Sequence, residues 1–171
     1  REICILMLSI NLSRLGIMRK VVNTLLVTLS SMFLAVSLSA SHHGADEKKP
    51  IEVVEAAYAT FASGDTDAWA GLHTDDLRFT VFGQLPQSGV FVGTQSVIEG
   101  VFAKIPVLWP GFTLTPINTD VVGDTVYVHN RMEAEGLDSE TMHMFVIEDG
   151  KIKSFTAFED TDSMRQAMKG Q

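Results

Sequence analysis

Residues 140–159, ETMHMFVIEDGKIKSFTAFE, contain the strongest local folding signal in this sequence. Apolar and polar side chains alternate on both sides of Asp149-Gly150, and an Asp-Gly pair between two such segments is typical of a tight β-hairpin. Two more segments of this kind, 112–122 and 125–136, precede the hairpin. The second half of the chain therefore predicts a meander of antiparallel strands.

Helical spacing dominates the first half of the domain. Apolar side chains recur every three or four residues within 50–63, 65–72 and 94–105, which predicts three helices. Pro106 is expected to stop the third helix, and residues 76–83 read as a strand between the second and the third. Helices followed by an antiparallel meander favour an α+β domain with the helices on one face of the sheet.

The residues before this domain have a different character. Residues 18–40 combine a basic start, an apolar stretch and small residues at the end, which is the layout of a secretory signal peptide, with an uncleaved membrane anchor as the alternative. Residues 1–17 are expected to be a leader outside the fold, and residues 41–49 a polar linker. The folded domain is then expected to cover 50–168.

Charge and cysteine content exclude several classes of function. The net charge is −8, and nine basic and 20 acidic residues remain once residues 1–40 are removed. A nucleic-acid partner is not expected, because phosphate contacts need clustered Lys and Arg. The only cysteine, Cys4, lies in the leader, so the domain has no disulfide, and export to a bacterial periplasm or secretion is expected. No motif indicates a cofactor, and no membrane contact is expected beyond residues 18–40.

One short motif in the linker offers a metal-binding alternative. Cleavage after Ser39 or Ala40 would leave His42 or His43 third from a free amine. This arrangement resembles the amino-terminal copper and nickel motif, in which amine, amide and imidazole nitrogens form a square-planar set. The simpler interpretation is a polar linker, and no metal site is expected within the domain.

Three longer motifs together resemble the SnoaL-like branch of the NTF2-like superfamily, which includes the ketosteroid isomerases. They are YATFASGDTDAWAGLHTDDLRFTVFG at 58–83, FVGTQSVIEGVF at 91–102 and HMFVIEDGKIKSFTAFED at 143–160. The resemblance implies a cone-shaped fold, in which three N-terminal helices pack in a curved antiparallel sheet around an apolar pocket. It also implies that a homodimer is common, and that the fold hosts isomerases, epoxide hydrolases, polyketide cyclases and binding proteins without catalysis.

The resemblance does not carry the isomerase mechanism into this sequence. The general base of the isomerases falls at Val81, and their protonated aspartate falls near Met142, with His143 one place away. Their oxyanion tyrosine falls near Ala57, with Tyr58 one place away. Valine and methionine neither accept a proton nor donate a strong hydrogen bond, so this mechanism fails at the base.

The epoxide-hydrolase pattern is also incomplete. Its polar positions on the first and last strands fall at Phe79, Val81 and Ala157, and an acid of the cyclase type is missing near Ala157 too. Arg131 and Glu133 on the middle strand remain as an Arg-x-acid pair. Burial favours the opposite face of that strand pointing inward, which would put both on the outer surface; an inward polar pair is the alternative.

A few polar side chains remain as weak catalytic candidates, namely Tyr58, Arg131, Glu133, His143 and Glu159. His73 is interpreted as a helix-end histidine and Asp75-Asp76 as a solvated turn. Apolar side chains and one amide are expected to form the ligand-binding wall of the cone. They are Tyr58, Phe79, Val81, Phe102, Asn130, Met142, Met144, Phe155 and Ala157.

These observations leave three hypotheses for function. The leading one is an exported SnoaL-like domain that binds a small, largely apolar organic molecule in the cone and needs no turnover. The second is an isomerase, lyase or hydrolase with a non-standard constellation, which requires at least two candidates, such as Tyr58 and His143, within hydrogen-bonding distance. The third is a dimeric interaction module, which would expose Tyr127, His129 and Phe145 on the outer sheet.

Overall fold

The computed structural model describes residues 49–170, and every structural statement below concerns that range. The predicted leader, signal peptide and most of the linker, with His42 and His43, lie outside the described residues. Between residues 49 and 170, no helix is both long and apolar enough to cross a membrane.

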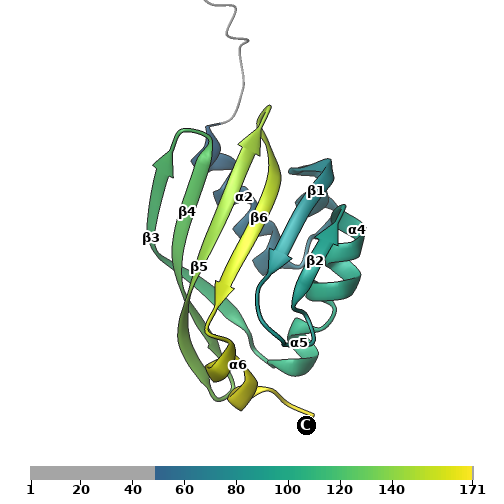
Figure 1. Cartoon of the computed structure of the whole chain (residues 1–171), viewed down its shortest axis with the longest axis vertical. Coiled ribbons are helices and arrows are strands. Elements are labelled where there is room, and N and C mark those ends of the chain that lie inside the picture. The colour runs from purple at the N-terminus through teal and green to yellow at the C-terminus, as the bar shows by residue number, and fades with distance from the viewer. Residues whose placement is uncertain (1–48, 171) are drawn as a thin grey trace, which may run out of the picture. The chain divides into compact units, whose positions relative to one another are not determined.

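A single six-stranded sheet forms the body of the domain (Figure 1). Its strand order is β2-β1-β6-β5-β4-β3. The strands are β1 (His73–Val81), β2 (Gly89–Val92), β3 (Thr113–Val122), β4 (Thr125–Ala134), β5 (Leu137–Glu148) and β6 (Lys151–Glu159).

The sheet is mixed, although the sequence predicted antiparallel pairing throughout. Neighbouring strands run antiparallel except β1 and β6, which run parallel. No hairpin joins these two strands; the chain passes through helices and four strands between them, so β6 can return in the direction of β1. The predicted α+β class is confirmed.

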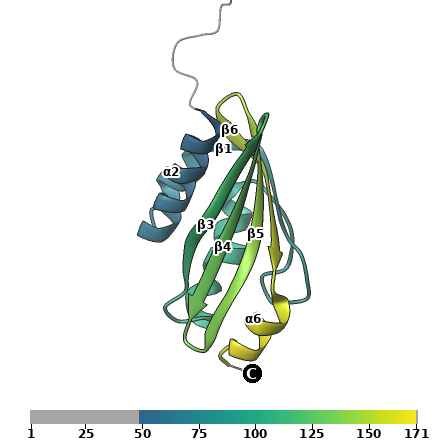
Figure 2. The ribbon, with the colours of Figure 1, turned by 90° about the vertical axis from the view of Figure 1, so that its left-hand side faces the viewer.

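The helices precede, interrupt and follow the strands in the chain, and Figure 2 shows the first of them lying along one face of the sheet. They are α2 (Pro50–Ser63), α3 (Thr66–Gly71), α4 (Thr94–Val97), the π-helical turn η1 (Ile98–Phe102), α5 (Ile105–Leu108) and α6 (Thr161–Ala167). Buried side chains of α2, α3, α4 and η1 share one apolar core with the inner face of the sheet.

The predicted hairpin and the predicted faces of the middle strand are confirmed. Asp149 and Gly150 both have a positive φ, at 50° and 70°, as a tight hairpin turn of the primed type requires. On β4, Val126, Val128, Asn130 and Met132 are buried in alternation with exposed or half-buried neighbours.

Two local predictions were wrong and a third was right in part. His73 begins β1 directly after Leu72, the C-cap of α3, and its Nδ1 meets the Trp69 carbonyl of that helix as expected. Asp75-Asp76 lie within the same strand instead of in a turn. Pro106 does not stop a helix: it lies in the first turn of α5, where a missing N–H costs nothing because no intrahelical acceptor is available.

The π-helical turn packs closely against β2. A Cβ atom added to Gly100 would lie only 2.8 Å from Cδ1 of Phe91, so this position has no room for a side chain. Gly71, the last residue of α3, has no other heavy atom within 4 Å of the same added Cβ. The contrast follows from packing, because neither glycine has a positive φ.

We expect Gly100→Ala to lower the free energy of unfolding by about 1–3 kcal/mol, because overpacking displaces Phe91. The matched change Gly71→Ala is expected to raise it by up to about 1 kcal/mol, because alanine reduces the entropy of the unfolded chain. Urea unfolding followed by circular dichroism measures both. Equal stability of the two variants would contradict the close packing of Gly100.

Candidate functional site

An apolar cavity of about 70 Å³ lies between the helices and the inner face of the sheet. Aromatic rings form much of its wall, including Phe79 and Phe155, which stack with their centroids 4.1 Å apart. A larger hollow of about 550 Å³ adjoins it between α2, α3 and η1, and Phe61, Trp69 and Phe102 border both spaces. The cavity and the larger hollow therefore share part of their lining.

A chain of polar groups reaches this cavity from three elements. The Tyr58 hydroxyl, on α2, lies 2.8 Å from Nδ1 of His143 on β5. Nδ2 of Asn130, on β4, donates to the same hydroxyl at 3.0 Å. The Val128 carbonyl accepts a second hydrogen bond from Nδ2 at 3.1 Å, which fixes the orientation of the Asn130 amide because a carbonyl oxygen can only accept.

The proton positions are assigned from these hydrogen bonds. Since the Asn130 amide donates to the Tyr58 oxygen, the phenol hydrogen is free to point at Nδ1 of His143. Nδ1 then acts as acceptor, and in the neutral ring the hydrogen sits on Nε2. The far side of the His143 ring therefore presents an N–H donor.

Glu159, at the end of β6, lies opposite that donor. Its Oε1 is 3.9 Å from Nε2 of His143, which is too long for a hydrogen bond. The two side chains are only 4% and 11% exposed, and both line the cavity. Within residues 49–170, neither Nε2 of His143 nor Oε2 of Glu159 has a hydrogen-bond partner. Both groups are thus available to a bound molecule.

Tyr58 is held in its protonated form. Burial raises the pKa of its phenol well above the usual value, and the negative charge of Glu159 raises it further, while the hydrogen bond from Asn130 acts in the opposite direction. The phenol therefore acts as a hydrogen-bond donor that orients the His143 ring.

His73, the first residue of β1, also lines the cavity. Its Nδ1 donates to the Trp69 carbonyl at 2.7 Å, and its ring packs on that of Trp69 at 3.9 Å. Burial lowers the pKa of His73 to about 4, although the Trp69 carbonyl opposes this. His73 is neutral near pH 7, and its chemistry is that of a packed, hydrogen-bonded ring.

Most of the predicted wall residues line the cavity. Those that do are Tyr58, Phe79, Val81, Phe102, Phe155 and Ala157. Asn130 is buried one hydrogen bond away, behind Tyr58.

The prediction was wrong for Met142 and Met144. Thr141, His143 and Phe145 alternate inward on β5, so both methionines face the outside, with Met142 37% exposed. Buried Phe145 likewise contradicts its predicted exposure in the interaction-module hypothesis, while Tyr127 is exposed as expected.

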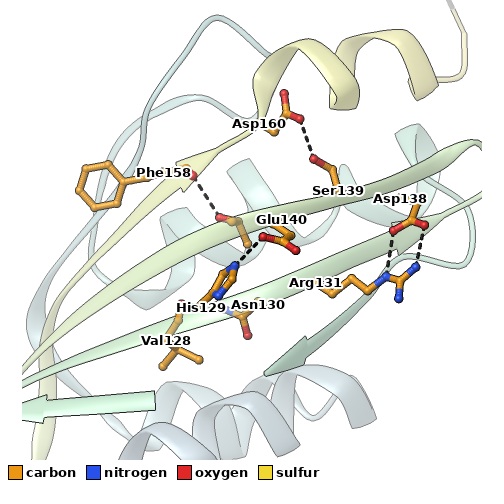
Figure 3. A network of polar contacts seen from close by, with 10 residues as sticks. Val128, His129, Asn130, Arg131, Asp138, Ser139, Glu140, Phe158 and Asp160 are labelled. Atoms are coloured by element: carbon orange, nitrogen blue, oxygen red, sulfur yellow. Dashed lines mark hydrogen bonds and ion pairs between the residues drawn. The ribbon is translucent and has the colours of Figure 1, made fainter. Parts of the chain in front are cut away.

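Arg131 and Glu133 lie on the outer surface, away from the cavity. Nε and Nη2 of Arg131 bond to the two oxygens of Asp138 at 2.8 and 2.6 Å (Figure 3). Oε1 of Glu133 is 3.7 Å from Nε of the same guanidinium. His129 pairs with Glu140 on this surface at 2.7 Å. These polar contacts lie on the solvated surface, which leaves Tyr58, His143 and Glu159 as the candidates that converge.

Gln87 is a cavity residue that the sequence did not indicate. It follows β1 in the loop before β2, its side chain is buried, and it lines the cavity. A single glutamine in an aperiodic loop gives no pattern that predicts its direction.

Comparisons with known proteins match both the sequence and the fold. Residues 54–155 match the SnoaL-like domain. An NTF2-like protein from Burkholderia thailandensis is 25% identical with a TM-score of 0.65, over 70% of this chain and 97% of that one. IdmH from Streptomyces antibioticus, a candidate polyketide cyclase, is 17% identical with a TM-score of 0.61, over 70% and 98%. TerC, crystallised with polyporic acid, is 23% identical with a TM-score of 0.63, over 69% and 96%. Among curated proteins, none matches.

The burial of His73 predicts a loss of stability in acid. The unfolded chain binds a proton at this residue below about pH 6.5, whereas the folded chain does so only below about pH 4. Stability is therefore full above pH 6.5 and falls by about 3 kcal/mol between pH 6.5 and pH 4 because of this group. Urea unfolding across this range should show a flatter pH dependence for His73→Gln than for the wild type. His129→Gln, on the outer surface, is the control; the same slope in His73→Gln and the wild type would refute the assignment.

Proposed function

This chain belongs to the SnoaL-like domain family, and we propose that its cavity binds a small, neutral, largely apolar carbonyl compound and transfers a proton on it. The observation that carries this proposal is the convergence of Tyr58, His143 and Glu159 on one cavity. It meets the condition set above for an enzyme, at least two candidates within hydrogen-bonding distance. It therefore favours turnover over binding alone.

The chemistry of the lining favours a neutral ligand with an apolar body. Aromatic and aliphatic side chains make up most of the wall, which suits a hydrocarbon skeleton. The carboxylate of Glu159 opposes an anion in the same space. The N–H of His143 instead suits an oxygen acceptor such as a carbonyl. The cavity is small, at about 70 Å³, and shares lining residues with the larger hollow, so a short-chain ketone is the appropriate probe.

The spacing of the two unpaired groups suits proton transfer beside a carbonyl. With the carbonyl oxygen at Nε2 of His143, the carbon next to the carbonyl faces Glu159. The carboxylate takes a proton from this carbon, the electrons of the C–H bond form a C=C bond, and the carbonyl electrons move to oxygen. The oxygen, now an enolate, keeps its hydrogen bond to His143. Return of the proton from Glu159 to the same or a conjugated carbon completes an exchange or an isomerisation.

In this proposal Tyr58 and Asn130 are positioning residues. They hold the His143 ring so that its donor side faces Glu159 and the cavity. The apolar Phe79 and Val81 stand where related enzymes keep polar groups, so Glu159 supplies the base from the last strand instead. Ring closure of a polyketide also begins with removal of a proton beside a carbonyl, and the likeness to a candidate polyketide cyclase supports this class of chemistry.

Hydrogen–deuterium exchange tests the proposal directly. Pentan-2-one in D₂O, followed by proton NMR, should exchange the hydrogens beside its carbonyl faster with the protein than in buffer. Glu159→Gln, which removes the base, should lower the protein-dependent rate by about a hundredfold or more.

Glu133→Gln is the matched control, because it removes the same charge from the outer surface. It should retain the wild-type rate. Binding of pentan-2-one without protein-dependent exchange would identify a binding protein and refute the catalytic proposal.

A further inference from the structure

We propose that Gln87 selects the ligand, by donating a hydrogen bond from its side-chain amide to a second carbonyl oxygen. The preferred compounds would then be neutral molecules with two carbonyl groups flanking the carbon that faces Glu159. This inference rests on the proposed function and names the substrate class of the same site.

The first observation is a buried amide with nothing to bond to. The Gln87 side chain lines the cavity, and the residue is only 2% exposed. Neither its Nε2 nor its Oε1 has a hydrogen-bond partner within residues 49–170. Buried amides are ordinarily hydrogen-bonded, since losing water without gaining a partner costs free energy. An amide kept in this condition indicates that its partner is a molecule bound in the cavity.

The second observation places Gln87 at the same end of the cavity as the proton-transfer groups. β1 and β6 run parallel, so the loop that leaves β1 after Val81 begins beside the end of β6. The Phe82 N–H donates to the Ala157 carbonyl at 3.3 Å, and Glu159 follows two residues later. Gln87 and Glu159 therefore enter the cavity from adjacent segments.

The third observation is that the loop is fixed by its own hydrogen bonds. The Leu85 N–H donates to Oγ of Ser88 at 3.0 Å, and the Ser88 N–H donates to the Leu85 carbonyl at 2.8 Å. Nζ of Lys104 donates to the Pro86 carbonyl at 2.6 Å. The backbone on both sides of Gln87 is thus held in place, which gives its amide a defined position before a ligand binds.

The arrangement of donors and acceptors then defines the ligand. His143 and Gln87 each offer an N–H donor, and Glu159 lies 3.9 Å from the first of them with a free oxygen. Two donors suit two carbonyl oxygens, and the carboxylate suits the C–H between them. A carbon between two carbonyls is also the more acidic, because both oxygens share the charge that develops.

Two probes with the same carbon skeleton, one with a single carbonyl group and one with two, test whether the protein recognises the second carbonyl oxygen. Pentane-2,4-dione is expected to bind the wild-type protein at least tenfold more tightly than pentan-2-one, by isothermal titration at a pH where both are neutral. Gln87→Met, which keeps the length of the side chain and removes its amide, should abolish this preference. Gln95→Met, the same change at an exposed position of α4, should preserve it.

Thermal unfolding provides a second readout that a purely structural glutamine would not give. Gln87→Met should raise the melting temperature of the ligand-free protein, because it removes an unpaired buried amide. A lower melting temperature, or an unchanged ratio of the two affinities, overturns the role of Gln87. If the ratio is unchanged while Glu159→Gln still abolishes exchange on pentan-2-one, only the role of Gln87 fails. If the wild type neither binds nor exchanges either probe, the proposed function fails with it.

Discussion

The pleat of the sheet is the constraint on which the site depends. Asn130, Thr141 and Glu159 lie opposite one another across β4, β5 and β6, and all three point inward. The neighbouring inward row is Val128, His143 and Ala157. The polar groups thus occupy adjacent rows of the sheet, whose strands are about 4.8 Å apart. A register shift of one residue would turn all the inward side chains of a strand to the outer surface.

Burial destabilises these polar groups where they lack a partner, and it strengthens the hydrogen bonds that they form. Tyr58, Asn130 and His143 satisfy one another in a chain of hydrogen bonds that links α2 to the sheet, so most of their polar atoms need no water. Three of the residues that keep unpaired buried atoms, His143, Glu159 and Gln87, line the cavity. Loss of water raises the free energy of these unpaired atoms. It also strengthens any hydrogen bond that they form with a ligand, because few dipoles compete in an apolar space.

The architecture was more predictable from the sequence than the site. The alternation of apolar and polar residues identified the hairpin at Asp149-Gly150. It also identified the two faces of β4, because only one face of that strand is clearly apolar. On β5 both faces are largely apolar, so periodicity could not choose between Met142 and His143, and the wrong one was placed in the cavity. Tyr58 and His143 are 85 residues apart in sequence, and their hydrogen bond follows from the packing of α2 on the sheet.

The π-helical turn has a consequence for how this cavity can change over evolutionary time. A π-helical turn holds one residue more than an α-helical turn, so the residues after it are rotated by about 100° around the helix axis. Phe102 ends this turn and lines both the cavity and the larger hollow. Deletion of a single residue would therefore turn the Phe102 side chain to another side of the helix and change the lining that the two spaces share. Substrate size in such a fold can diverge through the length of one helical turn, while the sheet that holds the reactive groups stays the same.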